Sequence, residues 1–420
     1  MTRAMKDSCI EWIGMIPEHW GFDKGKYHFT NKKYIVGVKS SNYDRLALTM
    51  NGVIHRNKED NEGLQPNDFN TYQLLRKNEL VFKLIDLQNI STSRIGLAHD
   101  TGIVSPAYVI LHANKDISPS YAEKFYLMMW HRQIFNALGD AGVRSNLNAN
   151  DLLNVRIPFP PLDEQNKIAD YLDKKCGEID AITAKIQEQI TTLEEYKKSV
   201  ISEAVTKGLN PNTPMKDSGI EWIGKIPLNW EVDKFKYHLN RKEIKNKPEL
   251  KVLSLYRELG IVPKDSRDDN HNVTSEDTSK YKYVKKGYFV VNKMKAWQGS
   301  VAVSDYEGIV SPAYYVYEFS DNKFNRRYFH YLLRGCYKDE FMRVSGGIRI
   351  GQWDLPADKL ENMLVVIPSP TEQKEIADYL DSKCSQVEEA IADKQKQIET
   401  LEEYKKTLIY EYVTGKKEVA

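Results

Sequence analysis

Two stretches of the chain have spacings that could support phosphate or metal chemistry. Gly219-Ile-Glu-Trp-Ile-Gly-Lys225 has the GxxxxGK spacing of a phosphate-binding loop. However, Ile226 stands where a Ser or Thr would hold Mg²⁺, and a closely similar earlier stretch has Met15 in place of the lysine. We therefore reject a phosphate loop and expect Trp12 and Trp222, which lie inside these stretches, to anchor a packed turn.

A second pattern, Asp233 followed by Glu243-Ile-Lys245, resembles the set of two carboxylates and a lysine that holds Mg²⁺ in nucleases. The similar earlier stretch has Lys33-Tyr-Ile35 at the Glu-x-Lys place, so the pattern is not shared. Loose patterns of this kind arise often in a chain of which 28% is charged. The sequence also lacks HExxH, GxSxG and the motifs of a methyltransferase, so we expect no catalytic site and no bound metal.

A third group of residues suits the recognition of nucleic acid. Arg and Lys can read guanine, and Asn and Gln can read adenine, by paired hydrogen bonds in the major groove. Each residue alone is an ordinary solvated loop residue, but together they form polar clusters at strand ends, where binding loops are common. The candidates are Lys83, Gln88, Asn89, Ser91, Arg94 and Arg144 in the first half, and Tyr256, Arg257, Arg267, Asn270, Asn272, Asn292, Lys293, Lys295, Trp297, Gln298 and Arg349 in the second.

An internal duplication organises the elements that position these residues. Residues 5–20 and 215–230 agree at twelve of sixteen positions. The motifs GIVSPAY, IADYLD and LEEYKK then recur in the same order in both halves. The chain is therefore a tandem repeat of a unit of about 210 residues, and two copies predict a pseudo-twofold molecule rather than a solenoid.

Each copy divides into a globular part and a helical part. Short β-type runs, such as Leu80–Ile85, Arg94–Ala98, Ala107–His112, Tyr288–Asn292 and Ala313–Phe319, precede a helical pattern at 120–137 and 324–343. Residues 163–206 and 372–413 have a helical pattern from end to end, after a proline-rich entry. We predict an α+β protein with mixed α/β domains at 1–157 and 214–366, and helical spacers at 158–213 and 367–420.

The two long helices carry an apolar seam of nearly four heptads, which predicts that they pack on each other as an antiparallel coiled coil. A seam of about 27 residues would span about 40 Å. The alternative is that each helix packs only on its own globular part. The predicted seam residues are Ile179, Ile182, Ile186, Leu193, Tyr196, Val200, Val387, Ile391, Ile398, Leu401, Tyr404 and Leu408.

The net charge of +1 conceals an uneven distribution, with an excess of positive charge in the globular parts and of negative charge in the helical parts. Residues 1–160 hold 19 Lys and Arg against 16 Asp and Glu, and residues 215–366 hold 26 against 21. Residues 161–214 hold 7 against 10, and residues 367–420 hold 8 against 12. Basic globular parts attract a phosphate backbone, whereas acidic helices do not.

Four cysteines without a CxxC pair, and no long apolar run, fit a reduced cytoplasmic chain.

The repeated motifs resemble those of a known family, the specificity (S) subunits of type I restriction–modification systems. The similar stretches are DSGIEWIGKIPLNW with its copy DSCIEWIGMIPEHW, GIVSPAY in both halves, and IPFPPLDEQNKIADYLD with its copy IPSPTEQKEIADYLD. The resemblance covers essentially the whole chain. Cys9 replaces a motif glycine, and the second helix entry is shorter by two residues; neither departure threatens the assignment.

The resemblance implies that each globular part is a target recognition domain that reads one half of a split DNA site. The helical pair would set the gap between the half-sites and dock two methylation (M) subunits, and restriction/translocase (R) subunits would complete the complex. S-adenosylmethionine, ATP and Mg²⁺ are expected on those partner subunits and not on this chain. Two other hypotheses stay open from the residues: a coiled-coil scaffold that binds RNA or protein, and a stand-alone nuclease that uses Asp233 and Glu243.

Overall fold

The computed structural model describes residues 3–60, 68–85, 87, 95–138, 146–257, 260–266, 274–275, 277–347 and 353–419. They form two compact units, one of residues 1–186 with 395–420 and the other of residues 187–394. Each unit therefore contains one globular part together with half of each long helix. None of the helices in the described ranges is both long enough and apolar enough to cross a membrane.

The globular part of the first unit is a set of short strands with three short helices. Two four-stranded sheets, of order β6-β5-β10-β7 and β4-β11-β8-β9, are accompanied by the pairs β1-β2 and β12-β3. The strands are β1 (Met5–Asp7), β2 (Met15–Pro17), β3 (Gly21–Lys24), β4 (Phe29–Thr30), β5 (Arg45–Thr49), β6 (Gly52–Arg56), β7 (Gln73–Leu75), β8 (Leu80–Phe82), β9 (Ile95–Leu97), β10 (Gly102–Val104), β11 (Val109–Ala113) and β12 (Arg156–Phe159), and the helices are α1 (Pro119–His131), α2 (Ile134–Leu138) and α3 (Ala149–Asn154).

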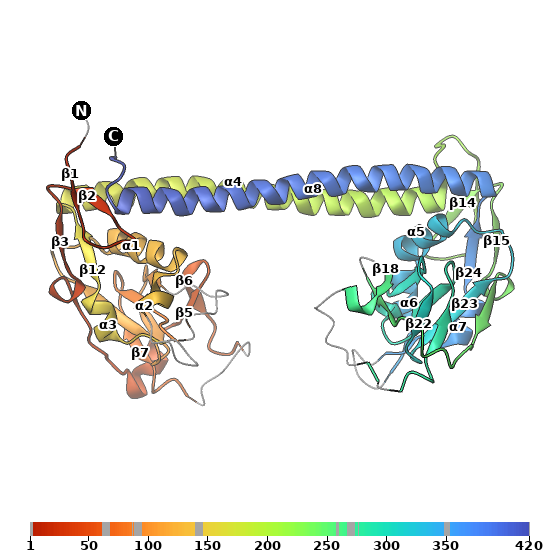
Figure 1. The fold of residues 1–420 in the computed structure, drawn as a ribbon, viewed down its shortest axis with the longest axis horizontal. Helices are drawn as coiled ribbons and strands as arrows, with labels where there is room; N and C mark the ends of the chain where they lie inside the picture. Colours follow the sequence, from red (N-terminus) through yellow and green to blue (C-terminus); the bar gives the residue numbers. More distant parts are fainter. Residues whose placement is uncertain are drawn as a thin grey trace. The chain divides into compact units, whose positions relative to one another are not determined.

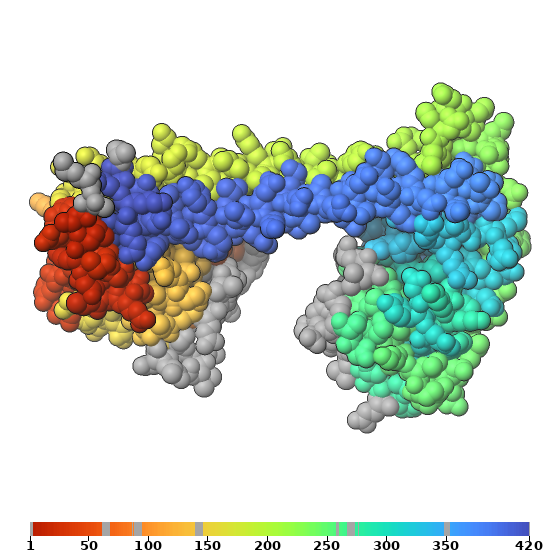
Figure 2. All heavy atoms as spheres, turned by 45° about the horizontal axis from the view of Figure 1, so that its top comes forward, coloured from red at the N-terminus to blue at the C-terminus, as the bar shows by residue number. Residues whose placement is uncertain are grey.

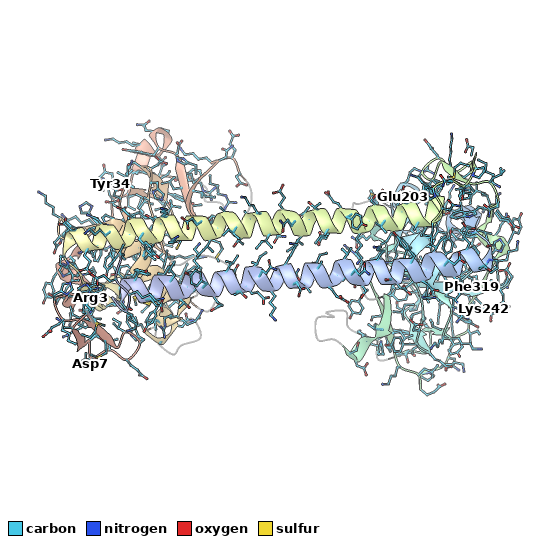
Figure 3. The ribbon with its side chains drawn as sticks, turned by 90° about the horizontal axis from the view of Figure 1, so that it is seen from above. Arg3, Asp7, Tyr34, Glu203, Lys242 and Phe319 are labelled. Carbon is cyan, nitrogen blue, oxygen red and sulfur yellow. The ribbon has the colours of Figure 1, made fainter. Side chains whose placement is uncertain are left out.

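The second unit repeats this plan, except that the pairs β17-β18 and β19-β22 stand in place of one four-stranded sheet. Its four-stranded sheet has the order β16-β23-β20-β21, and Lys242 and Phe319, labelled in Figure 3, lie at the two ends of the β16–β23 pairing. The strands are β13 (Met215–Asp217), β14 (Lys225–Pro227), β15 (Glu231–Lys234), β16 (Leu239–Lys242), β17 (Leu253–Tyr256), β18 (Gly260–Pro263), β19 (Lys282–Val284), β20 (Phe289–Asn292), β21 (Val301–Val303), β22 (Gly308–Val310), β23 (Tyr314–Phe319) and β24 (Leu364–Ile367), and the helices are α5 (Arg326–Cys336), α6 (Lys338–Val344) and α7 (Ala357–Asn362).

The predicted strands are present as β8, β9, β11, β20 and β23, whereas each predicted short helix is in fact two helices. In the first unit the helix breaks after His131, where Gln133 adopts a positive φ of 60°. In the second unit the break falls at Tyr337, which ends α5 and begins α6. A left-handed residue cannot continue a right-handed helix, so apolar periodicity alone overestimated the length of the first.

The two long helices are α4 (Leu162–Lys207), with 46 residues, and α8 (Pro370–Val413), with 44. Within each unit they lie side by side (Figure 1) and run antiparallel. In the first unit Tyr171 meets Tyr412 with ring centroids 4.6 Å apart, and Lys405 pairs with Asp180 at 2.6 Å. In the second unit Lys394 donates to Gln189 at 2.6 Å. The predicted antiparallel packing is therefore confirmed.

The predicted seam is correct in most positions and wrong in three. Ile179, Val387 and Leu408 are buried, and Ile186, Leu193, Val200, Ile391, Ile398 and Leu401 are partly buried. In contrast, Ile182 and Tyr196 are each 48% exposed and Tyr404 is 54% exposed, so these three lie outside the seam.

Polar residues at seam positions explain this error. Lys197 and Lys405, rather than the tyrosines that precede them, are the partly buried residues, and they pair with Glu388 and Asp180. A lysine can bury its aliphatic stem while its ammonium group reaches a carboxylate, so it fills a seam position that an apolar pattern does not mark. Ile190, which is 3% exposed, lies in the seam and was missed.

Each globular part is tied to the beginning of one long helix by a buried glutamine. The side-chain oxygen of Gln165 accepts from the backbone N–H of Ser118 at 2.8 Å, and its amide nitrogen donates to the carbonyls of Pro160 and Asp116 at 2.9 and 3.2 Å. Gln373 repeats the arrangement with Asn325 at 2.7 Å, and with Pro368 and Lys323 at 2.9 and 2.7 Å. These contacts give the repeated Glu-Gln motif a structural role.

The end of the other long helix is tied to the same globular part by a tyrosine. Tyr121 donates to the carbonyl of Val413 at 3.0 Å, and Tyr328 donates to the carbonyl of Val205 at 3.2 Å. Both tyrosines are almost completely buried, within clusters that also contain apolar residues of α4 and α8. The core of each unit is therefore incomplete without both helices.

Cys176 and Cys384, at matching positions of the helices, are buried thiols. Burial raises the pKa of each thiol, which disfavours the reactive thiolate. We therefore interpret both as packing residues.

The glutamine ties predict a specific loss of stability. Replacing Gln165 or Gln373 by Leu removes the partner of three buried backbone groups, and we expect a loss of about 3 kcal/mol in the free energy of unfolding. Gln187→Leu, at an exposed position of α4, is the matched control and should change the free energy by no more than about 0.5 kcal/mol. Urea unfolding measures both, and a Gln373→Leu variant as stable as the control would contradict the assigned role.

Candidate nucleic-acid interface

The repeated motif GIVSPAY builds the same strand and turn in both units. Gly-Ile-Val forms the buried strand β10 or β22, and Ser-Pro-Ala-Tyr then forms a turn in which the tyrosine N–H donates to the serine carbonyl, at 3.2 Å for Tyr108 and 3.0 Å for Tyr314. A Cβ on Gly102 would lie 2.6 Å from the carbonyl oxygen of Asp44, and one on Gly308 would lie 2.5 Å from that of Lys251. Only glycine therefore fits at the first position of the motif.

Different buried side chains support this turn in the two units. In the first unit Gln73 donates to the carbonyls of Ser105 and Tyr108 at 2.9 and 2.7 Å. In the second unit Lys282 donates to the carbonyl of Tyr314 at 2.8 Å and pairs with Glu243 at 2.9 Å. Gln73 lies opposite Val104 in its sheet and Lys282 lies opposite Val310, so the two are matching positions that have diverged in chemistry.

In the second unit, several candidates from distant parts of the sequence come together beside this turn. Arg257, just after β17, donates to the side-chain oxygen of Gln298 in a short 3-10 helix, η5 (Ala296–Gln298). Next to Gln298, the Trp297 ring lies 5.6 Å from that of Trp353, between ring centroids. Lys293 pairs with Asp354 at 3.0 Å. We call Arg257, Lys293, Trp297, Gln298 and Trp353 the polar–aromatic cluster.

Backbone hydrogen bonds hold this cluster in place. The N–H of Leu355 donates to the carbonyl of Lys293 at 2.9 Å, and the N–H of Lys293 donates to the carbonyl of Ala313 in the GIVSPAY turn at 3.2 Å. The indole N–H of Trp297 donates to the carbonyl of Met294 at 3.0 Å. The cluster therefore rests on the repeated frame. Trp353 belongs to it but was not among the candidates; its place four residues after the candidate Arg349 was the one signal in the sequence.

The three remaining described candidates of the second unit differ in accessibility. Asn292 is 8% exposed, and its side-chain oxygen accepts from the N–H of Met294 at 3.2 Å, so it shapes the turn. A contact of Asn292 with DNA stays a prediction. Lys295 is exposed, and Tyr256 is partly buried beside Arg257.

Most first-unit candidates and four second-unit candidates lie outside the described residues. Lys83 is described, and it is partly buried one residue after β8. Nine candidates lie outside the described residues: Gln88, Asn89, Ser91, Arg94, Arg144, Arg267, Asn270, Asn272 and Arg349. For these nine the prediction stays a prediction.

The cluster supplies binding groups rather than catalytic ones. A guanidinium, an ammonium group, a side-chain amide and two indole rings can donate hydrogen bonds and stack, which are the means by which proteins bind bases and phosphates. Within the described ranges, no group of three His, Cys, Asp or Glu residues is placed to hold a metal ion. The geometry therefore suits recognition.

The two rejected or weak catalytic patterns have structural roles. The GxxxxGK stretch forms the turn between strands β13 and β14, and Trp222 packs at 5.8 Å on Tyr337. Asp233 pairs with His238 at 3.2 Å, whereas Glu243 pairs with Lys282 and with Arg241 at 3.0 Å. These cations lower the pKa of Glu243 and oppose the effect of its partial burial, so its charge is already compensated.

The long helices offer a second kind of surface. The repeated motif LEEYKK leaves its glutamates and its tyrosine exposed in both copies: Glu194, Glu195 and Tyr196 on α4, and Glu402, Glu403 and Tyr404 on α8. Figure 2 shows that side chains of α8 form an uncovered surface along the helix. Arg3, labelled in Figure 3, pairs with Glu164 in the first turn of α4 and so ties the start of the chain to that helix.

The chain is similar to known proteins of one family. A family model described as the type I restriction modification DNA specificity domain matches residues 43–192 and 235–402. The chain is 28% identical over 285 residues to the type I restriction enzyme MjaVIII specificity subunit of Methanocaldococcus jannaschii, covering 63% of this chain and 62% of that protein. It is 27% identical over 112 residues to the StySPI specificity subunit of Salmonella potsdam, covering 27% of this chain and 24% of that protein. The chain thus matches less than two thirds of the length of each relative.

Two solved structures share the fold. One chain, from a structure described as the basis of complex assembly and conformational transition of the type I R-M system, aligns with a TM-score of 0.69 over 95% of this chain and 98% of its own length. The HsdS subunit from Thermoanaerobacter tengcongensis aligns with a TM-score of 0.50 over the same shares of the two chains. At 14% identity in both cases, the likeness establishes the architecture of repeated domains and paired helices.

Proposed function

The chain belongs to the type I restriction modification DNA specificity family, and on that premise we propose that it is the non-catalytic specificity subunit of a type I restriction–modification complex in the cytoplasm. Each globular part would read one half of an asymmetric, split site on double-stranded DNA. The helical pair would set the gap between the half-sites and dock the methylation subunits. S-adenosylmethionine, ATP and Mg²⁺ would be held by partner subunits.

The observation that carries the proposal is a constant frame with divergent polar loops. Both units keep the glycine, the turn and the helix ties, whereas the residue under the turn is Gln73 in one unit and Lys282 in the other. The polar–aromatic cluster of the second unit rests on that frame. A scaffold that is kept while its binding groups change is suited to reading two different sequences.

The surface of the helices supports the docking of a partner that is present twice. LEEYKK exposes the same two glutamates and the same tyrosine on α4 and on α8, although the recognition loops have diverged. Tyrosine is enriched at protein interfaces. Two copies of one surface fit two methylation subunits, to which restriction/translocase subunits would then attach.

The direct test is to co-express the chain with its cognate methylation subunit and to map methylated adenines across the host genome. We expect one motif with two unlike half-sites and a fixed gap, because the two units present different loops. Methylated palindromes, or methylation without sequence preference, would contradict the proposal. Methylation subunits that fail to co-purify, together with RNA binding, would favour the scaffold hypothesis instead.

A second test addresses the gap. Residues 183–189 of α4 and 395–401 of α8 are one heptad each, and removing both shortens each long helix by about 10 Å, or roughly 3 bp of B-DNA. We expect the mapped gap to shorten by about that amount while both half-sites stay the same. A control that replaces the two heptads with an equal number of helix-forming residues should leave the gap unchanged. Altered half-sites with an unaltered gap would contradict the spacer role.

A further inference from the structure

Both units expose the same two side chains on a short turn outside the polar–aromatic cluster. Lys26 and Tyr27 end the 3-10 helix η1 (Gly25–Tyr27), and Lys236 and Tyr237 end η3 (Phe235–Tyr237). Tyr27 is 58% exposed and Tyr237 is 59% exposed. The lysine ammonium lies over the tyrosine ring in each, 5.1 and 5.4 Å from the ring centroid. We call these segments the twin turns.

The backbone of the twin turns is fixed in the same way in both units. The first N–H of the turn donates to the carbonyl of Val155 at 2.9 Å in one unit and of Met363 at 3.1 Å in the other. The carbonyl of each tyrosine accepts a side-chain hydrogen bond at 3.0 Å, from Asn114 or from Ser320. Each exposed Lys-Tyr pair is therefore held on a rigid support, which reduces the ordering cost of binding.

The acidic groups around the twin turns are paired with a histidine instead of with the lysines. His28 lies 2.7 Å from the carboxylate of Asp116, and His238 lies 2.8 Å from that of Asp321 and 3.2 Å from that of Asp233. Among the residues that the structure describes, no carboxylate lies within 4.0 Å of the ammonium group of Lys26 or Lys236, or of Lys24 or Lys234. Each turn therefore presents positive charge to solvent.

Packing explains the histidine, the aspartate and the backbone of each turn, but not the outward-facing side chains. An exposed tyrosine contributes little to the core, yet Lys and Tyr are kept in both copies while many neighbouring positions differ. In the second unit Lys236 also donates to the side-chain oxygen of Asn362 at 2.9 Å, and Asn154 ends the matching helix in the first unit. Lys, Tyr and Asn side chains commonly contact phosphate oxygens in protein–DNA complexes.

One short helix, α7, connects the polar–aromatic cluster to the second twin turn. Helix α7 begins at Ala357, three residues after Asp354, and ends at Asn362, which contacts Lys236. Its six residues rise about 9 Å. A base-reading cluster and a backbone contact at such a separation can act on the same stretch of duplex, because the major groove is about 12 Å wide and is bordered by phosphates.

We propose that the twin turns are sequence-independent phosphate grips, one for each half-site, formed by Lys26 with Tyr27 and by Lys236 with Tyr237. The inference rests on the proposed function and adds to it, since it separates the residues that position the DNA from those that read it. The feature that two unlike half-sites share is the phosphate backbone, so a contact kept in both copies suits it. Because no carboxylate in the described part of the chain compensates these lysines, they favour the phosphate backbone as the ligand over a partner protein that binds at both turns.

The test compares the full chain, assembled with its methylation subunits, with a Lys26→Gln, Lys236→Gln variant. Binding is measured on a duplex that carries the mapped site and on a scrambled duplex of equal length, at salt concentrations between about 50 and 200 mM. We expect the slope of log K against log salt to fall by about 1.8, and the Kd at 0.1 M salt to rise roughly tenfold for each lysine. Both duplexes should be affected by the same factor, with the mapped motif unchanged.

One matched variant serves as a control, and a second tests the tyrosine hydroxyl groups. Lys185→Gln with Lys374→Gln removes exposed lysines from the helices and should leave the salt slope at its parental value. Tyr27→Phe with Tyr237→Phe removes only the hydroxyl groups and should weaken binding to both duplexes without changing the slope. Because all these side chains are exposed, thermal unfolding should match that of the parent.

Three results distinguish the possible readings. A parental slope and Kd in the Lys26→Gln, Lys236→Gln variant would overturn the phosphate grip. Loss of the methylation subunits, with DNA binding by the chain alone unchanged, would overturn it in favour of protein docking. If the parent showed no preference for the mapped duplex but the variant still lost slope, the proposed function would fail while the phosphate grip stood.

Discussion

Each globular part depends on a buried polar joint to the helices. The amides of Gln165 and Gln373 each satisfy three backbone groups where a globular part meets the start of a long helix. A buried amide that loses such partners carries a large desolvation cost, so the joint fixes the angle of the helix as well as its position. Tyr121 and Tyr328 complete the joint from the end of the other helix. Each unit is thus built around two helix ends that come from distant parts of the chain.

This constraint explains which positions the two copies keep. Gly102 and Gly308 are kept because a Cβ would collide with a backbone carbonyl, and the Glu-Gln entry is kept because it forms the joint. The support under the turn needs only a donor of suitable length, so an amide in one copy and an ammonium group in the other both serve. Loops beyond that support are free to change, which allows one architecture to present unlike binding surfaces.

Much of the architecture could be predicted because it follows from repetition and periodicity. The duplication, the strands and the paired helices were all visible in the sequence. The register of the seam was not, because Lys197 and Lys405 occupy positions where an apolar residue was expected, while the apolar-looking Ile182 and Tyr404 face solvent. The break at Gln133 was missed for a similar reason, since a positive φ leaves no mark on an apolar pattern.

Prediction of the site was limited by the fact that its parts meet only in three dimensions. Arg257 and Gln298 were recognised as candidates separately, but their contact depends on how β17 and η5 pack. The burial of Asn292 and its hydrogen bond with the N–H of Met294 also depend on the folded turn, and no sequence pattern indicates them. Trp353 was overlooked because a single tryptophan has no spacing that distinguishes it. Residue type indicates the chemistry of a loop, but the frame decides which groups reach a ligand.

The most direct measurement of the central claim, a fixed frame with independent reading surfaces, is the mapped motif of an Arg257→Ala, Gln298→Ala variant with its cognate methylation subunit. The account predicts relaxed base preference, worth about 1–3 kcal/mol, within one half-site. The other half-site and the gap should remain as in the parent. Changes in both half-sites, or a changed gap, would contradict it.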